Sequence, residues 1–310
     1  MDKKNVLSIK NLNKIYSKKS DKPIHAINNL NLDVQEGEIF GLLGPNGAGK
    51  TTFINILAGT VIKTSGKVNV WGFDLDNNPR QVRASIGIVP QEVNLDPFFT
   101  PRKLLELQAG LYGVKKKDRI TDAILKLVSL EDHANSYARS LSGGMKRRLL
   151  IAKSLVHQPP IIILDEPTAG VDVRLRKNLW ENVKLLHGQG VTIILTTHYL
   201  EEAEEMCDRI GILSKGNLVA LDSTKNLLNK IQTKKVTFKL DKSAKIGNNE
   251  LSSLKVLSLK ENEISLSYEK NRIEMEEIIN LIKKDNVRIL DISTEDGDLE
   301  DVFLRLTKNR

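Results

Sequence analysis

The chain has 310 residues, enough for one large domain and one small domain, each with a buried core. Hydrophobic residues make up 40% and charged residues 28% of the chain, which excludes a disordered or fibrous protein. The formal net charge of +8 is not gathered in one basic run, so a phosphate-rich ligand or an anionic lipid surface explains it as well as nucleic acid does.

The first elements predict an α/β fold. Residues 6–9 and 30–34 alternate between apolar and polar side chains, as half-buried strands do, and the lysine-rich stretch 16–22 between them predicts a turn. Residues 39–43 predict a short buried strand that runs directly into a glycine-rich loop, and residues 52–57 have helical spacing. This strand–loop–helix order begins a βα unit and predicts a mostly parallel sheet.

The middle of the chain changes character twice. From residue 101 to about 159, leucine and isoleucine recur at helical spacing and β-branched runs are scarce, which predicts a helical insertion. Strand patterns return at 161–164, 191–195 and 210–213. These apolar runs are far shorter than a bilayer span, so a membrane role would need a separate membrane-embedded partner.

After about residue 222 the pattern becomes that of a small α+β unit. Strict alternation predicts strands at 236–240 and 264–268, followed by an amphipathic helix at 273–282, a strand at 287–292 and a helix at 299–306. The only cysteine, Cys207, excludes an internal disulfide and fits a reducing cytosol.

A phosphate-binding loop follows the strand at 39–43 and matches the pattern G-x-x-x-x-G-K-[ST]. Its residues are Gly44, Pro45, Asn46, Gly47, Ala48, Gly49, Lys50, Thr51 and Thr52. Glycines allow the backbone to point successive N–H groups at phosphate oxygens, and the following helix adds its positive end. We expect Lys50 to reach the β- and γ-phosphates and the Thr51 hydroxyl to coordinate Mg²⁺. A chance glycine turn is the alternative, and the strand before and helix after argue against it.

A second strand, at 161–164, ends in two acids, Asp165 and Glu166. Adjacent carboxylates at the end of a buried strand need a counterbalancing charge, and Mg²⁺ held by Asp165 through water would supply it. Glu166 would then lie at the carboxyl edge of the sheet and polarise the attacking water. Two solvated acids at an ordinary strand end would be the better interpretation if the phosphate loop were absent.

A third motif narrows the class of nucleotide hydrolase. Leu141, Ser142, Gly143, Gly144 and Met145 resemble the signature sequence of the ABC ATPase family, with Met145 in place of the more usual glutamine. Further family elements follow the family order: Tyr16 resembles the aromatic that stacks on adenine, Gln91 the Q-loop glutamine, Asp172 the D-loop aspartate and His198 the switch histidine. On these motifs, residues 6 to about 222 are identified as a member of the ABC ATPase family.

The resemblance implies a fold and a set of domains. It implies a P-loop NTPase: a RecA-like core with a mostly parallel sheet, an antiparallel β subdomain and a helical subdomain at about 92–159. Residues 1–222 would form this ABC ATPase domain, and residues 223–310 the small C-terminal α+β domain.

The resemblance also implies roles for these residues. Glu166, His198 and Lys50 would be catalytic, ATP and Mg²⁺ would be bound, and the metal would be held by Thr51, Gln91 and Asp165. By its residue type, Gln91 could instead hydrogen-bond the loop, and Tyr16 could simply cover the core.

The signature has a physical interpretation of its own. Ser142 is a good N-cap, but the two glycines behind it weaken the helix by roughly 1 kcal/mol each relative to alanine. A helix end that lets a phosphate approach bare N–H groups explains that cost. In the family this end meets the ATP of the opposite subunit, so two chains complete two sites.

Three function classes compete for such a chain. The signature and the acid pair argue against a generic P-loop kinase or GTPase. Ribosome-acting ABC proteins typically carry two cassettes, and DNA-repair relatives carry long coiled coils; this chain has one phosphate loop and no sustained heptad run. A soluble ABC ATPase acting on ribosomes or nucleic acid is therefore the alternative to a transporter motor.

The expected function is the ATP-hydrolysing subunit of an exporter. Residues 298–307 are similar to the closing segment of export cassettes of the drug, antibiotic and polysaccharide branch. The resemblance implies a homodimer bound to integral membrane permease subunits, peripheral on the cytoplasmic face of the inner (plasma) membrane, with no nucleic-acid partner.

Overall fold

The computed structural model describes residues 4–17, 22–169, 173–229, 233–242, 254–269, 272–283, 287–296 and 299–308. The chain divides into two compact units, Met1–Asp222 and Ser223–Arg310. Among the described residues, no helix combines the length and the apolar character needed to cross a membrane.

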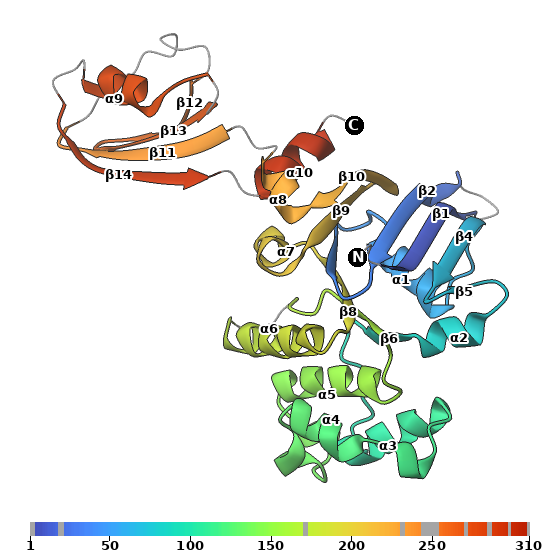
Figure 1. Ribbon diagram of the computed structural model, residues 1–310. Helices are drawn as coiled ribbons and strands as arrows, with labels where there is room; N and C mark the ends of the chain where they lie inside the picture. Colours follow the sequence, from blue (N-terminus) through green and yellow to red (C-terminus); the bar gives the residue numbers. More distant parts are fainter. Residues whose placement is uncertain are drawn as a thin grey trace. The chain divides into compact units, whose positions relative to one another are not determined.

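A six-stranded sheet forms the centre of the first unit (Figure 1). Its order is β10-β9-β3-β8-β7-β6, and the pairs β9–β3, β3–β8, β8–β7 and β7–β6 are parallel. The strands are β3 (Ile39–Leu43), β6 (Ile86–Val89), β7 (Ile161–Asp165), β8 (Thr192–Thr197), β9 (Arg209–Ser214) and β10 (Asn217–Ser223). Because β3, β7 and β8 are buried along their whole length, they do not alternate between apolar and exposed polar residues. Apolar residues and threonine occupy both faces, and Asp165 ends β7.

A second sheet of the first unit is antiparallel, with the order β2-β1-β4-β5. It consists of β1 (Asn5–Tyr16), β2 (Ile24–Gln35), β4 (Ser65–Val70) and β5 (Phe73–Asp74). One hydrophobic core joins its inner side chains, such as Leu7 and Leu30, to Phe40 and Ile163 of the central sheet. The antiparallel subdomain therefore shares its core with the parallel one.

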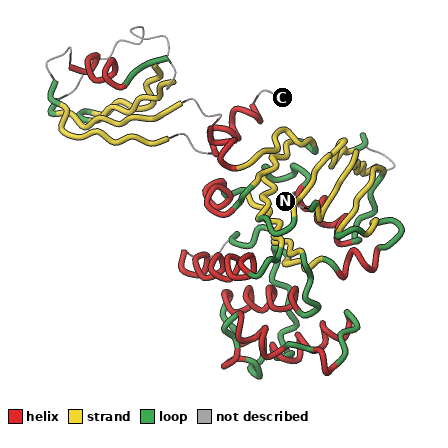
Figure 2. Tube along the Cα trace, in the orientation of Figure 1, coloured by secondary structure: helices red, strands yellow, loops and turns green. Residues whose placement is uncertain are grey.

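Helices complete the first unit, and residues 101–155 contain helices and loops with no strand (Figure 2). The α-helices are α1 (Lys50–Ala58), α2 (Pro79–Ala84), α3 (Pro101–Leu111), α4 (Thr121–Leu127), α5 (Gly143–Leu155), α6 (Val173–Gly188) and α7 (Leu200–Met206). Short 3₁₀ turns lie at Lys116–Asp118, Glu131–His133 and Ala138–Ser140. The predicted helical insertion is present at these positions.

The second unit has its own sheet, of order β12-β13-β11-β14, whose strand pairs are all antiparallel. Its elements are α8 (Thr224–Asn229), β11 (Thr233–Leu240), β12 (Leu254–Lys260), β13 (Glu263–Glu269), α9 (Met275–Lys283), β14 (Ile289–Asp296) and α10 (Leu299–Lys308). Val236 and Phe238 of β11 pack with Leu266 of β13 and Ile278 of α9 in a separate apolar core. The α+β character predicted for this part of the chain is present.

Candidate functional site: an ATP site at the carboxyl ends of the parallel strands

The phosphate loop begins where β3 ends, and two of its glycines cannot be replaced without strain. Gly49 has φ +112°, and a Cβ atom there would lie 2.4 Å from the Ala26 carbonyl oxygen. A Cβ atom at Gly44 would lie 2.5 Å from the Leu213 carbonyl oxygen. The glycine turn is therefore held against neighbouring backbone on both sides. Helix α1 begins at Lys50, directly after Gly49, so the last three residues of the loop form its first turn and its free N–H groups face the glycine turn.

The loop side chains divide into an exposed and a buried set. Pro45, Asn46 and Thr51 are exposed, whereas Ala48 and Lys50 are buried. The Lys50 ammonium donates to the Gly44 carbonyl at 2.6 Å and lies 3.4 Å from Oε1 of Glu166. The positive charge of Lys50, which is only 5% exposed, is thus compensated by the Glu166 carboxylate at the end of a different strand.

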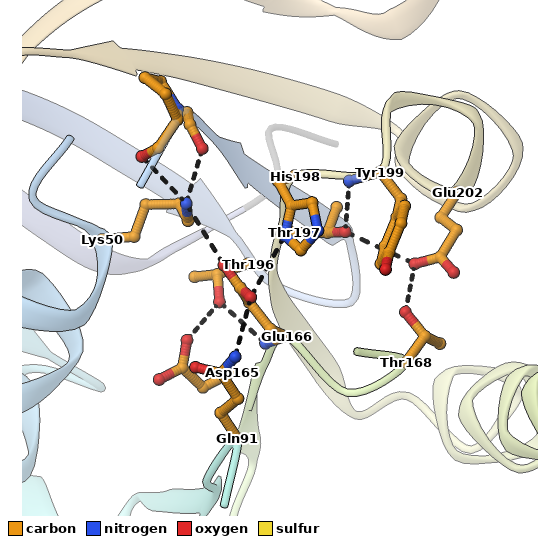
Figure 3. Close-up of polar contacts among 12 residues, drawn as sticks. Lys50, Gln91, Asp165, Glu166, Thr168, Thr196, Thr197, His198, Tyr199 and Glu202 are labelled. Atoms are coloured by element: carbon orange, nitrogen blue, oxygen red, sulfur yellow. Dashed lines mark hydrogen bonds and ion pairs between the residues drawn. The ribbon is translucent and has the colours of Figure 1, made fainter. Parts of the chain in front are cut away.

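Glu166 is the residue on which the predicted site converges (Figure 3). Besides Lys50, its carboxylate accepts a hydrogen bond from Nε2 of Gln91 at 3.1 Å and lies 3.2 Å from Nδ1 of His198. Gln91 comes two residues after β6 and His198 directly after β8, and both strands pair with β7 in parallel. Their carboxyl ends therefore meet at one edge of the sheet.

Asp165, the last residue of β7, is buried beside this cluster and accepts a hydrogen bond from the Thr196 hydroxyl at 2.7 Å. Burial raises the pKa of Asp165; the Thr196 hydrogen bond lowers that pKa in part, and the nearby Glu166 charge raises it further. Two buried carboxylates side by side form a site that a cation would stabilise.

The signature segment is exposed at its tip. Ser142 caps α5, its hydroxyl accepting a hydrogen bond from the Met145 amide at 3.3 Å. A Cβ atom on Gly143 would meet no atom of the other described residues within 4 Å, apart from its chain neighbours and the backbone of its own helix. The first turn of α5 is thus capped, as its sequence predicts, and the surface over Gly143 is open.

The structure does not bring Tyr16 into contact with this cluster. Tyr16, at the end of β1, is 39% exposed, and the Lys14 ammonium lies 4.6 Å from the centre of its ring. Asp172 lies outside the described residues.

Sequence reasoning missed two residues that contact Glu166, Arg147 and Thr196, and a hydrogen-bonded pair that starts two residues after it, Thr168 and Glu202. Arg147 donates hydrogen bonds to the Glu166 and Pro167 carbonyls, and Thr196 accepts from the Glu166 amide. Buried Glu202 accepts from the Thr168 hydroxyl at 2.7 Å (Figure 3). The spacing of Arg147 with Leu150, Ile151 and Ser154 was a usable signal, because it places a charge on the buried stripe of α5.

Comparison with known proteins identifies the family. Residues 27–169 match the ABC transporter family. The linearmycin resistance ATP-binding protein LnrL of Bacillus subtilis (strain 168) is 33% identical over 97% of this chain and 98% of its own length. The chain belongs to the ABC transporter ATP-binding family. The predicted family and the predicted ATPase activity are thereby confirmed.

Other relatives agree with this family assignment. The Nod factor export ATP-binding protein I of Rhizobium sp. (strain N33) is 42% identical over 65% of this chain and 67% of that protein. A dimeric post-hydrolysis structure of the ATP-binding cassette MJ0796, bound to ADP and Pi, matches with a TM-score of 0.62 and 29% identity, covering 70% of this chain and 98% of the cassette. The predicted P-loop NTPase fold is confirmed, and these relatives give no support to the ribosomal alternative.

Proposed function

We propose that this ABC ATPase is the motor subunit of an exporter and that it hydrolyses ATP at the edge of the sheet where β3, β6, β7 and β8 end. The observation that carries the proposal is the convergence of Lys50, Gln91 and His198 on the carboxylate of Glu166. These residues come from four separate segments of the chain. A purely structural glutamate at a strand end would not need all three partners.

The chemistry follows from the positions of the side chains. The N–H groups of the phosphate loop and the start of α1 would bind the β- and γ-phosphates, with Lys50 turning from Glu166 toward them. Glu166, released from Lys50, would accept a hydrogen bond from a water and orient it in line with the γ-phosphorus. The water oxygen forms the new P–O bond as the bond to the ADP oxygen breaks, which yields ADP and phosphate. His198 would hold a γ-phosphate oxygen.

The donor atoms near this edge suit Mg²⁺, which prefers oxygen ligands and usually shares them with substrate phosphates. The Thr51 hydroxyl, the Gln91 amide oxygen and the Asp165 carboxylate would hold it; Gln91 uses its amide nitrogen on Glu166, which leaves the oxygen as its donor. Bound Mg²⁺ would neutralise phosphate charge.

The open tip of α5 supports a dimer. We propose that Leu141, Ser142, Gly143, Gly144 and Met145 of one copy cover the γ-phosphate bound to the other, with Asp172 near the same interface and Tyr16 against the adenine. The exposed Ser142 cap leaves room for that contact, as does the open space over Gly143 within the described part of the chain. The structural relatives include dimeric cassettes, one of them bound to ADP and Pi.

The exporter assignment rests on the relatives, whose names include linearmycin resistance and Nod factor export. We propose that two copies act with integral membrane permease subunits, as peripheral proteins on the cytoplasmic face of the plasma membrane, without a nucleic-acid partner.

Two measurements test this proposal. Affinity purification from detergent-solubilised membranes should recover an integral membrane protein in a fixed ratio, whereas ribosomal particles would favour the soluble alternative. Sedimentation of Glu166→Gln with Mg·ATP, alone and with the permease, should show the closed dimer accumulating. A variant that stays monomeric in both settings would contradict the dimeric motor.

A further inference from the structure

Arg147, in the second turn of α5, is a buried charged residue that the proposed chemistry does not use. It is 5% exposed, and its guanidinium donates to main-chain carbonyls on two different loops. On the loop after β6 these are Pro90 at 3.0 Å and Gln91 at 2.5 Å. On the loop after β7 they are Glu166 at 2.8 Å and Pro167 at 2.9 Å.

Burying a guanidinium costs free energy, so its partners indicate what the residue is for. Desolvation lowers the pKa of Arg147, and the charge of Asp165 opposes that shift. Its hydrogen bonds go to backbone oxygens, and a rigid planar fork bonded to backbone fixes the path of the chain.

The backbone at Glu166 needs such support. Glu166 has φ +43°, a left-handed conformation that residues with a Cβ atom rarely adopt. Its amide donates to Thr196 at 3.0 Å, and its carbonyl accepts from Arg147 and from the Ala169 amide at 3.2 Å. In this conformation the carboxylate meets Lys50, Gln91 and His198.

We propose that Arg147 is a positioning residue for ATP hydrolysis. By holding the Glu166 and Gln91 carbonyls together, it keeps Glu166 left-handed and aims its carboxylate at the water. Because Arg147 lies on the helix that begins at the signature, a movement of α5 is transmitted to the carboxylate that orients the water. This inference rests on the proposed role of Glu166.

The neighbouring residue provides a matched control. Arg148 lies on the same helix and also donates to two carbonyls, those of Val128 and Ser129, each at 2.7 Å. These carbonyls belong to the helical segment, not to the loops at the strand ends. Loss of Arg148 therefore removes two hydrogen bonds of the same kind, half as many as Arg147 makes, without touching the Glu166 backbone.

The experiment compares Arg147→Met, Arg147→Lys and Arg148→Met in the full chain, beside wild type and Glu166→Gln. Steady-state phosphate release gives kcat and KM, equilibrium binding gives ATP affinity, and thermal unfolding gives stability. We expect Arg147→Met to lower kcat about 100-fold, the order expected for displacing a catalytic group by 1 Å, with ATP affinity nearly unchanged. Arg147→Lys should recover part of the loss, and Arg148→Met should lower Tm while keeping kcat near wild type.

Other outcomes overturn the inference. A folded Arg147→Lys with wild-type kcat would show that the guanidinium fork is not needed, and this variant decides the matter if Arg147→Met does not fold. Equal loss of kcat in Arg147→Met and Arg148→Met would make the role structural, as would loss of ATP affinity with kcat kept. A Glu166→Gln variant that hydrolyses ATP like wild type would instead overturn the proposed function.

Discussion

The two units of this protein differ in how many charged side chains they bury. In the first unit, charged side chains are buried: Glu38, Lys50, Arg147, Asp165, Glu166 and Glu202 are all less than 9% exposed. In the described part of the second unit, the buried polar residues are Thr224 and Ser265, and its core is apolar. Burying a charged group lowers the stability of the folded protein unless ion pairs and hydrogen bonds offset the cost, so buried charges are often retained for function. The contrast therefore places the chemistry in the first unit.

Within the first unit, position along the strands separates functional from structural charge. Lys50 and Arg147 both contact Glu166, which follows Asp165 at the carboxyl end of β7. Ligands of parallel sheets bind at this edge. Glu38 lies just before β3, at the opposite end, and pairs with Arg209 at 3.0 Å. A buried charge thus indicates a site when it lies at the ligand-binding edge.

The largest expected effect is on Glu166. Glu166→Gln keeps the shape of the side chain but weakens it as an acceptor for the attacking water, so turnover should fall by at least about 100-fold. Phosphate release under single-turnover conditions measures this, with ATP binding as the control for folding. Turnover close to wild type would remove Glu166 from its proposed role.

Phe238→Ala tests whether the apolar second unit is independent of the chemistry. Phe238 is fully buried in that core, so its loss should lower the stability of the unit by about 3 to 5 kcal/mol. Amide hydrogen exchange over residues 233–242 measures the stability of the second unit. ATP turnover should stay within about twofold of wild type. Lys239→Ala, an exposed neighbour on β11, should change neither quantity. Loss of turnover in Phe238→Ala would link the two units.

Arg209→Met tests whether a buried charge at the other end of the strands is structural. Glu38 would lose its ion-pair partner, and stability should fall by about 3 kcal/mol with kcat retained. The effect has a pH dependence. Burial already raises the pKa of Glu38 above 4.5, and Arg209 lowers it in part, so the variant raises it further.

The folded variant then holds a proton that the unfolded chain has released, so its stability declines as pH rises above 4.5. Denaturant unfolding of variant and wild type should therefore differ more at pH 7 than at pH 5. An equal loss of stability at pH 5 and pH 7 would argue against a Glu38 carboxylate that has lost its compensating charge.

The smallest expected effect is on the surface of the second unit. Lys235 and Glu295 lie 2.9 Å apart on neighbouring strands and are both exposed. Lys235→Ala should change stability by less than about 1 kcal/mol, and added salt should remove the difference. Denaturant titration at low and high salt measures it, and a loss comparable to that of Phe238→Ala would contradict the contrast between the units.

Sequence patterns alone determined the local parts of this protein. The phosphate loop can be recognised from the sequence because its glycines, Lys50 and Thr51 lie within a few consecutive residues, and the turn at Gly49, with φ +112°, favours glycine. The cap of α5 is readable because Ser142 bonds an amide three residues away. Both depend on neighbours in the chain, as do the helical insertion at 101–155 and the alternation of β11 and β13.

Tertiary structure alone decided how the site is assembled. Gln91, Glu166 and His198 are far apart in the chain and meet because β6, β7 and β8 lie side by side and parallel. The left-handed conformation of Glu166 has no sequence signal, because a glutamate adopts it only when surrounding groups such as Arg147 and Thr196 hold it. Features that depend on neighbouring residues, such as the loop and the helix cap, can be predicted from the sequence. The left-handed backbone of Glu166 and the meeting of its partners depend on contacts that form only when the sheet is complete.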